Sequence, residues 1–281
     1  MTMTEQPAAD IRTAEARTVL DVRDLTVTFS RAGRTVHAVN GLSYRLTAGR
    51  MLAIIGESGS GKSVSVRALM GLLPPSARIG GSARLGDTEL VGLREKDMRR
   101  VRGDDIAMVF QDPARSLNPT MTVGAQITEA IRLKSRVDRK DADARAVELL
   151  KLVRLPAAER RFHEYPHQLS GGMRQRVMIA IALASDPQVL IADEATTALD
   201  FVTQTQIIQE IQALEKKLNV TRIMVTHDMS VVATACDEVA VVYAGRLVEM
   251  GSTLDTLVDP LHPYTRCLIN SYPNFLEEGD V

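Results

Sequence analysis

The chain has 281 residues, 45% of them hydrophobic and 25% charged, and its formal net charge is -1. These values suit one large domain, or two closely joined lobes, around a sizeable core. The near-neutral charge argues against nucleic acid as the main partner, because phosphate backbones are usually met by a surplus of Lys and Arg. No apolar run approaches the roughly 18 to 20 residues of a helical membrane span, so we expect a cytosolic protein that reaches a membrane only through a partner.

The N-terminal part predicts a tail followed by antiparallel β-structure. Residues 1–17 contain acidic residues and no apolar core, which is untypical of a signal or transit peptide, and we expect a flexible tail. Alternation of apolar and polar residues over 19–29 predicts a strand, with a turn at RAGR, residues 31–34. Residues 36–46 predict a second pair of strands, joined by a turn at Asn40 and Gly41.

Short apolar runs then alternate with helical patterns. The predicted strands lie at residues 52–55, 106–110, 189–193, 222–227 and 238–245. The predicted helices lie at residues 63–73, which Pro74 and Pro75 follow, and at 141–152, 171–184 and 203–218. This alternation predicts an α/β fold with a parallel sheet covered on both faces, and the stretch from 113 to about 185 predicts a helical insertion.

The strand at 52–55 is followed by GESGSGKS, a complete GxxxxGK[ST] sequence. Its residues are Gly56, Glu57, Ser58, Gly59, Ser60, Gly61, Lys62 and Ser63. In such a loop the glycines let successive backbone N–H groups turn toward phosphates, and the following helix adds positive potential. Lys62 would reach the β- and γ-phosphates, and the Ser63 hydroxyl would bind Mg²⁺. The motif indicates a nucleoside triphosphate, and kinases and GTPases share it.

Two further motifs add carboxylates and a second phosphate cradle. The strand at 189–193 delivers Asp193 to its carboxyl end, where it can hold Mg²⁺, and Glu194 then stands where it could polarise an attacking water as a general base. Ser170, Gly171 and Gly172 open a helix with backbone amides suited to phosphate but bring no lysine. A second cradle on one nucleotide-sized core suggests that it serves the nucleotide of another subunit.

The sequence LSGGMRQR resembles the signature of ATP-binding cassette (ABC) ATPases, and the resemblance extends from about Val19 to Tyr272. It implies that Ser170, Gly171 and Gly172 cap the γ-phosphate held by the opposing subunit. It also implies that Gln111 contacts Mg²⁺ or the attacking water, that Asp200 contacts the opposing subunit, and that His227 contacts the γ-phosphate and holds Glu194. By this resemblance the catalytic set is Lys62, Gln111, Glu194 and His227, with Mg²⁺ held by Ser63, Gln111 and Asp193. Phe29 is the candidate for stacking on adenine, and His37 is a weaker one.

The resemblance implies a RecA-like P-loop core with an N-terminal antiparallel β-subdomain. The cassette would span residues 18–255, with a helical subdomain over about 113–180 and a C-terminal extension over 256–281. Within the family, FQDPARSLNPTMTVGAQITEAI and DPLHPYTRCLINSYP are similar to the ATPase subunits of oligopeptide, dipeptide and nickel importers. The HPYT sequence at 262–265 is typical of that branch.

Two departures from the branch stand out. Ala195 follows Glu194 where the branch usually has Pro, so the loop after Glu194 is expected to be slightly looser. Many members continue into a cysteine-rich extension that holds an iron–sulfur cluster. Here Cys267 is the only cysteine after His262, and the other, Cys236, precedes it. We therefore expect ATP and Mg²⁺ as cofactors and no iron–sulfur cluster.

The resemblance implies an ATPase that drives an importer from the cytoplasmic face of the cell membrane. Its implied partners are a second ABC ATPase subunit (a paralogue or an identical chain), two transmembrane permease subunits and an extracytoplasmic substrate-binding protein. Oligopeptides or dipeptides are the favoured cargo, with nickel chelates, opines and oligosaccharides left open. The alternatives are an exporter ATPase, a P-loop kinase, in which LSGGMRQR would have no use, and a non-transport ABC ATPase of DNA repair or translation. The last usually carries two cassettes, coiled-coil insertions or basic segments.

Overall fold

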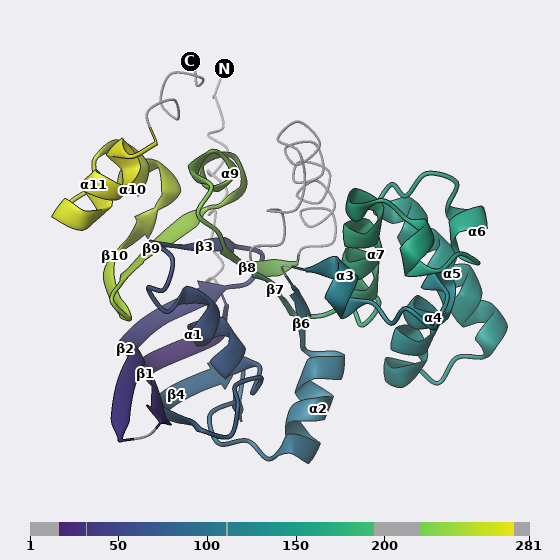
Figure 1. The fold of residues 1–281 in the computed structure, drawn as a ribbon, viewed down its shortest axis with the longest axis horizontal. Coiled ribbons are helices and arrows are strands. Elements are labelled where there is room, and N and C mark those ends of the chain that lie inside the picture. The colour runs from purple at the N-terminus through teal and green to yellow at the C-terminus, as the bar shows by residue number, and fades with distance from the viewer. Residues whose placement is uncertain (1–16, 32, 111, 194–219, 273–281) are drawn as a thin grey trace, which may run out of the picture.

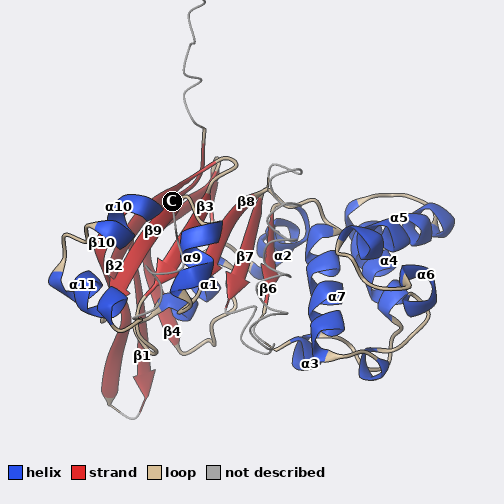
Figure 2. Ribbon diagram, turned by 90° about the horizontal axis from the view of Figure 1, so that it is seen from above, coloured by secondary structure: helices blue, strands red, loops and turns tan. Residues whose placement is uncertain are grey.

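The computed structural model describes residues 17–31, 33–110, 112–193 and 220–272 (Figure 1). Nearly all of the predicted tail and the whole of the predicted helix over 203–218 lie outside these residues. Within the described part, two sheets stand beside each other and a lobe of helices lies to one side of them (Figure 2). No helix in these ranges is long and apolar enough to cross a bilayer.

The first sheet is antiparallel and has the strand order β2-β1-β4-β5. Its strands are β1 (Thr18–Arg31), β2 (Arg34–Thr47), β4 (Ala77–Leu85) and β5 (Thr88–Glu89). The predicted antiparallel β-subdomain is thus confirmed, as is the turn between residues 31 and 34.

The turn predicted at Asn40 and Gly41 is wrong, because both residues lie inside the single strand β2. Leu25 of β1 pairs with Leu42 and Thr26 pairs with Asn40, so Gly41 is an extra residue in the ladder. Its φ of +79° is a left-handed value that glycine adopts without strain. The bulge moves the buried positions from Val39 to the even-numbered residues from Leu42 onward, which keeps both halves of the strand facing the core.

The second sheet has the strand order β10-β9-β3-β8-β7-β6. Its strands are β3 (Met51–Ile55), β6 (Ile106–Val109), β7 (Val189–Asp193), β8 (Thr221–Val225), β9 (Glu238–Tyr243) and β10 (Arg246–Ser252). All neighbours pair in parallel except β9 and β10. Strands β3, β6, β7 and β8 are buried along their whole length, which explains the apolar runs of β3, β6 and β7.

The parallel register brings the carboxyl ends of three strands to one edge. Ile54 near the end of β3 pairs with Val225 at the end of β8, and Val225 pairs with Asp193 at the end of β7. The glycine-rich loop follows β3, and His227 follows β8. Residues far apart in the sequence therefore meet where ligands of open α/β sheets bind.

The helical lobe has a hydrophobic core that includes Val123, Ile127, Leu150 and Val177 and that continues onto Val109 of β6. Its elements are α3 (Pro113–Ser116), α4 (Val123–Lys134), α5 (Arg139–Leu152), α6 (Ala158–Arg161), a single 3₁₀ turn (Pro166–Gln168) and α7 (Gly171–Leu183). The helices predicted at 141–152 and 171–184 are confirmed by α5 and α7.

The remaining helices lie against the sheets. They are α1 (Lys62–Leu69), α2 (Glu95–Asp104), α9 (Met229–Ala235), α10 (Thr253–Val258) and α11 (Pro263–Asn270). Helix α1 ends four residues before its predicted end. The reason is Gly71, whose left-handed φ of +58° turns the chain so that the Leu72 N–H bonds back to the Arg67 carbonyl at 2.9 Å. The helix is thus closed by glycine before the prolines are reached.

Candidate functional site

The glycine-rich loop is pressed against two strands, which makes two of its glycines obligatory. A Cβ atom at Gly56 would lie 2.1 Å from the Val242 carbonyl oxygen, and one at Gly61 would lie 2.2 Å from the Ala38 carbonyl oxygen. Both glycines also have positive φ, +145° and +103°. Any side chain at either position would push the loop away from the strand that it contacts. The sequence therefore permits the close approach that a backbone cradle for phosphate requires.

Lys62, the first residue of α1, is folded back into the loop. Its side chain is buried, and Nζ donates hydrogen bonds of 2.8 Å to both the Gly56 and the Glu57 carbonyl oxygens. The ammonium group thus lies across the mouth of the loop, with the half-buried Ser63 directly behind it on the helix. A buried cation at a helix N-terminus favours the binding of an anion.

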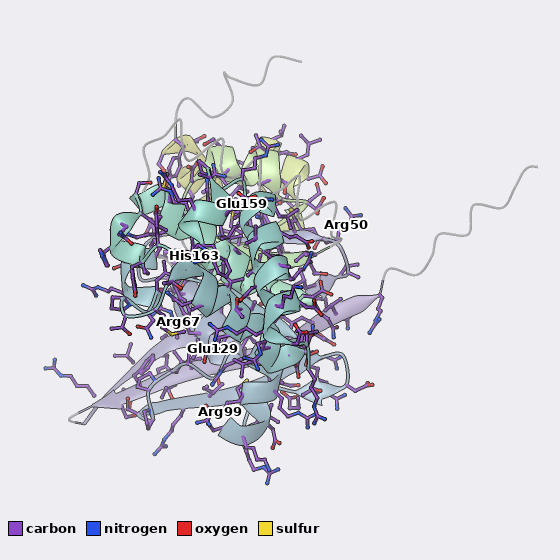
Figure 3. The ribbon with its side chains drawn as sticks, turned by 90° about the vertical axis from the view of Figure 1, so that its right-hand side faces the viewer. Arg50, Arg67, Arg99, Glu129, Glu159 and His163 are labelled. Carbon is purple, nitrogen blue, oxygen red and sulfur yellow. The ribbon has the colours of Figure 1, made fainter. Side chains whose placement is uncertain are left out.

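Asp193 lies at the end of β7 and is buried, with 1% of its surface exposed. Its Oδ2 accepts hydrogen bonds from Arg67 Nε at 3.1 Å and Nη2 at 3.0 Å, and Figure 3 labels this arginine. Its Oδ1 is buried with no hydrogen-bond partner among the described residues. A buried carboxylate oxygen without a partner is costly to keep unless a ligand completes it.

The unpaired Oδ1 of Asp193 fits a site for Mg²⁺. Mg²⁺ prefers carboxylate and hydroxyl oxygens and keeps several of its waters. The Asp193 carboxylate and the Ser63 hydroxyl are such ligands, delivered to the same edge by β7 and by the start of α1. Arg67 was not expected at this site from the sequence. Its spacing of four residues from Ser63, which places both on one face of α1, is the signal that could have found it.

A cavity of about 490 Å³ opens beside the loop. It is lined by Gly56, Glu57, Ser58 and Lys62 of the loop and by the exposed His227 after β8. Its opposite wall comes from α11 and the two residues after it: Tyr264, Cys267, Leu268, Ser271 and Tyr272. The structure thus brings Lys62 and His227 together as the sequence led us to expect, and adds the C-terminal helix, which it did not.

The Ser-Gly-Gly turn begins α7 in the helical lobe, whereas α1 lies against the sheets (Figure 2). Ser170 is the N-cap, and its Oγ accepts the Met173 N–H at 3.3 Å. Ser170 and Gly171 are exposed, and a Cβ atom at Gly171 would meet nothing within 4 Å. Among the described residues that line the cavity, none belongs to this turn. The Ser-Gly-Gly turn is therefore exposed at the surface of the lobe.

Several predicted site residues are not brought into the cavity or cannot be placed. Gln111, Glu194 and Asp200 lie outside the described residues, as does Ala195. Phe29 is half-buried on β1, where it packs against the core beneath the antiparallel sheet, and His37 is exposed on β2. The roles assigned to these residues remain predictions.

A glycine-rich loop between a buried parallel strand and a helix, with a buried lysine and a carboxylate at the end of a nearby strand, defines a P-loop protein that binds nucleoside triphosphates. The antiparallel sheet, the helical lobe and its Ser-Gly-Gly helix start narrow this class to ATP-binding cassettes. Residues 39–197 match the model of the ABC transporter family, and the chain belongs to that family.

Relatives of known designation match along nine-tenths or more of the chain. The oligopeptide transport ATP-binding protein OppD of Escherichia coli (strain K12) is 46% identical over 281 residues, 100% of this chain and 83% of the relative. The OppD of Bacillus subtilis (strain 168) is 48% identical over 93% of this chain and 74% of its own length. The dipeptide transport ATP-binding protein DppD of the same B. subtilis strain is 47% identical over 91% of this chain and 77% of its own length.

Solved structures agree on the fold. A dimeric post-hydrolysis structure of the ATP-binding cassette MJ0796 bound to ADP and Pi superimposes with a TM-score of 0.75 at 28% identity, over 83% of this chain and 98% of that one. The structure of cbiO1 from Clostridium perfringens has a TM-score of 0.74 at 26% identity, over 92% of this chain and 99% of that one. The predicted fold is confirmed, and the chain is an ATP-binding, ATP-hydrolysing cassette of an ABC transporter.

Proposed function

We propose that this chain powers an importer of oligopeptides or dipeptides. One observation carries the proposal: the match to the oligopeptide protein of E. coli extends over all 281 residues, well past the part that matches the general family model. It therefore includes the HPYT segment, which the sequence alone had already associated with this branch. The B. subtilis dipeptide protein supports the same class of cargo.

In this proposal the nucleotide lies on the glycine-rich loop, and Lys62 donates to phosphate oxygens while it keeps its hydrogen bond to the Gly56 carbonyl. Ser63 and Asp193, helped by Gln111, would hold Mg²⁺, which neutralises the charge that develops on the phosphates during transfer. Phe29, or else His37, would hold the adenine by stacking. Positioning and charge stabilisation account for most of the rate enhancement in such a site.

Hydrolysis requires groups that hold the attacking water. Glu194 would accept its proton as the general base, and His227, which shares the cavity with Lys62, would hold Glu194 in place and contact the γ-phosphate. The open turn at Ser170 would complete the nucleotide site of a second ATPase subunit, with Asp200 at the same contact. This arrangement explains why the turn is exposed and does not line the cavity of its own chain.

The proposed assembly has a second ATPase subunit, a paralogue or an identical chain, and two permease subunits that anchor the pair at the cytoplasmic face of the membrane. Residues around Gln111 and the helical lobe would pass closure of the ATPase pair to the permeases. An extracytoplasmic binding protein would deliver the cargo. The proposed domains are the cassette over 18–255 and the extension over 256–281.

The proposal is tested by purifying the tagged full-length chain from membranes and reconstituting the co-purified complex with its binding protein. Peptides of two to five residues should stimulate ATP hydrolysis, and Glu194→Gln should abolish the stimulated rate. Stimulation by a nickel chelate or an oligosaccharide, but not by peptides, would contradict the proposed cargo. Recovery of the chain with ribosomes or DNA and without hydrophobic permeases would contradict the transport function itself.

A further inference from the structure

The HPYT sequence forms the start of α11, and three of its four residues either begin the helix or pack in its interior. His262 is the N-cap, and its Nδ1 accepts the Tyr264 N–H at 3.1 Å. Pro263 occupies the first helical position, where its missing N–H costs nothing. Thr265 is completely buried. Tyr264 is the residue of the motif whose side chain these tasks do not explain.

The segment is fixed to the sheet that carries the phosphate-binding loop. The Glu249 carboxylate on β10 accepts the N–H groups of Leu261 at 2.8 Å and His262 at 3.0 Å. Partial burial raises the pKa of Glu249, but the nearby Thr265 hydroxyl, together with these two backbone N–H groups and His262, holds the pKa below its usual value. Leu268 and Ile269 of α11 pack in a core cluster with Ala53 and Ile55 of β3, the strand that runs into the loop. The helix and the loop therefore share one rigid support.

From this support Tyr264 reaches the loop. Its Oη accepts the Glu57 N–H at 3.0 Å, and its ring lies against that of Tyr243 with a centroid separation of 4.4 Å. Burial raises the pKa of the Tyr264 phenol, although the bond from Glu57 lowers it in part. The phenol therefore stays neutral throughout the physiological range.

The Glu57 N–H belongs to the same peptide unit as the Gly56 carbonyl. That carbonyl accepts one of the two hydrogen bonds from Lys62 Nζ, at 2.8 Å. In a trans peptide the C=O and N–H groups point in opposite directions, so the unit is held by Tyr264 at one end and by Lys62 at the other. Gly56 is a glycine with φ of +145°, and a peptide unit next to glycine can rotate at little steric cost.

We propose that Tyr264 is a positioning residue for nucleotide binding: it fixes the Gly56–Glu57 peptide unit and through it the Lys62 ammonium. The C-terminal helix is thereby a brace on the phosphate-binding loop as well as a covering of the sheet. The inference concerns the nucleotide site and does not depend on which cargo is transported.

The test is Tyr264→Phe, which keeps the ring and its packing against Tyr243 and removes only the hydroxyl. We measure binding of Mg²⁺ and the non-hydrolysable analogue AMP-PNP to the full-length chain by calorimetry. The dissociation constant should rise about threefold to tenfold, as expected for loss of one hydrogen bond that orders a binding group. The melting temperature without nucleotide should change by less than about 2 °C, because one partly exposed hydrogen bond contributes little to a chain of this size. Tyr243→Phe is the matched control, because its hydroxyl is not part of the argument, and it should bind as the wild type does.

A double variant tests whether Tyr264 acts through the lysine. In a Lys62→Ala background, Tyr264→Phe should have no further effect on the dissociation constant, because the ammonium that it positions is gone. The proposal is overturned if Tyr264→Phe binds AMP-PNP as tightly as Tyr243→Phe does. It is also overturned if the loss of affinity is as large without Lys62, or if it appears only together with a large fall in the melting temperature.

Discussion

Arg67 should be needed for the stability of the nucleotide-free chain, because it supplies the positive charge beside Asp193. Replacing it by leucine removes two hydrogen bonds from a carboxylate whose side chain is 2% exposed. Breaking a fully buried pair costs about 3 to 5 kcal/mol. The Arg67 side chain is 44% exposed, so water screens part of this interaction and we expect a loss of about 2 kcal/mol. At about 2 to 4 °C per kcal/mol, the melting temperature should fall by about 4 to 8 °C.

The assay is thermal unfolding of Arg67→Leu with no nucleotide, with ATP and EDTA, and with ATP and Mg²⁺. Because Mg²⁺ would supply the missing charge next to Asp193, the deficit should shrink only in the last condition. Arg99→Leu is the matched control: Arg99, also labelled in Figure 3, forms an exposed pair with Glu95 on α2 and should cost less than about 0.5 kcal/mol. A deficit no larger than that of the control, or one that Mg²⁺ and ATP leave unchanged, would refute the reasoning.

Four other changes should have distinct effects. Lys62→Ala should weaken ATP binding itself by tenfold or more, because it removes the buried cation of the loop; equilibrium binding measurements would show this, and unchanged affinity would count against the cradle. Glu194→Gln should keep ATP affinity within about twofold and lower kcat at least a hundredfold, whereas wild-type turnover would remove Glu194 from the general-base role. Gly61→Ala should abolish ATP binding, since its Cβ would meet the Ala38 carbonyl oxygen at 2.2 Å; a variant that binds normally would show that the loop can move off the sheet. Glu249→Gln should lower the melting temperature most at neutral pH. The pKa of the Glu249 carboxyl is lower in the folded chain than its unfolded value of 4.5. Its contribution to stability is therefore complete well above pH 4.5 and is lost as the pH falls through the folded pKa. A difference in melting temperature from the wild type that grows on acidification would contradict the assignment.

The sequence by itself determined the class of fold and the phosphate-binding loop, because both depend on local patterns. Short continuous apolar runs are typical of strands buried on both faces, and they located β3 and β7 correctly. The glycines and the lysine of the loop are contiguous, so their spacing alone indicated a nucleotide site. Parallel pairing then accounts for why His227 shares a cavity with Lys62.

Local signals misled where a neighbouring strand or an earlier residue decided the outcome. Asn40 and Gly41 are a strong hairpin signal in isolation, but pairing along the whole of β1 turned them into a bulge within one strand. Pro74 predicts that α1 ends at Leu73, whereas Gly71 ends the helix four residues earlier.

Only the tertiary structure decided which side chains complete the site. Arg67 and Asp193 are 126 residues apart in the chain, and Glu57 and Tyr264 are 207 apart. No periodicity or spacing rule connects residues at such separations, because the contacts exist only once the strands have paired and α11 has packed beneath β3. The sequence motif thus identified the phosphate-binding loop, while the packing of distant elements determined which residues hold that loop in place.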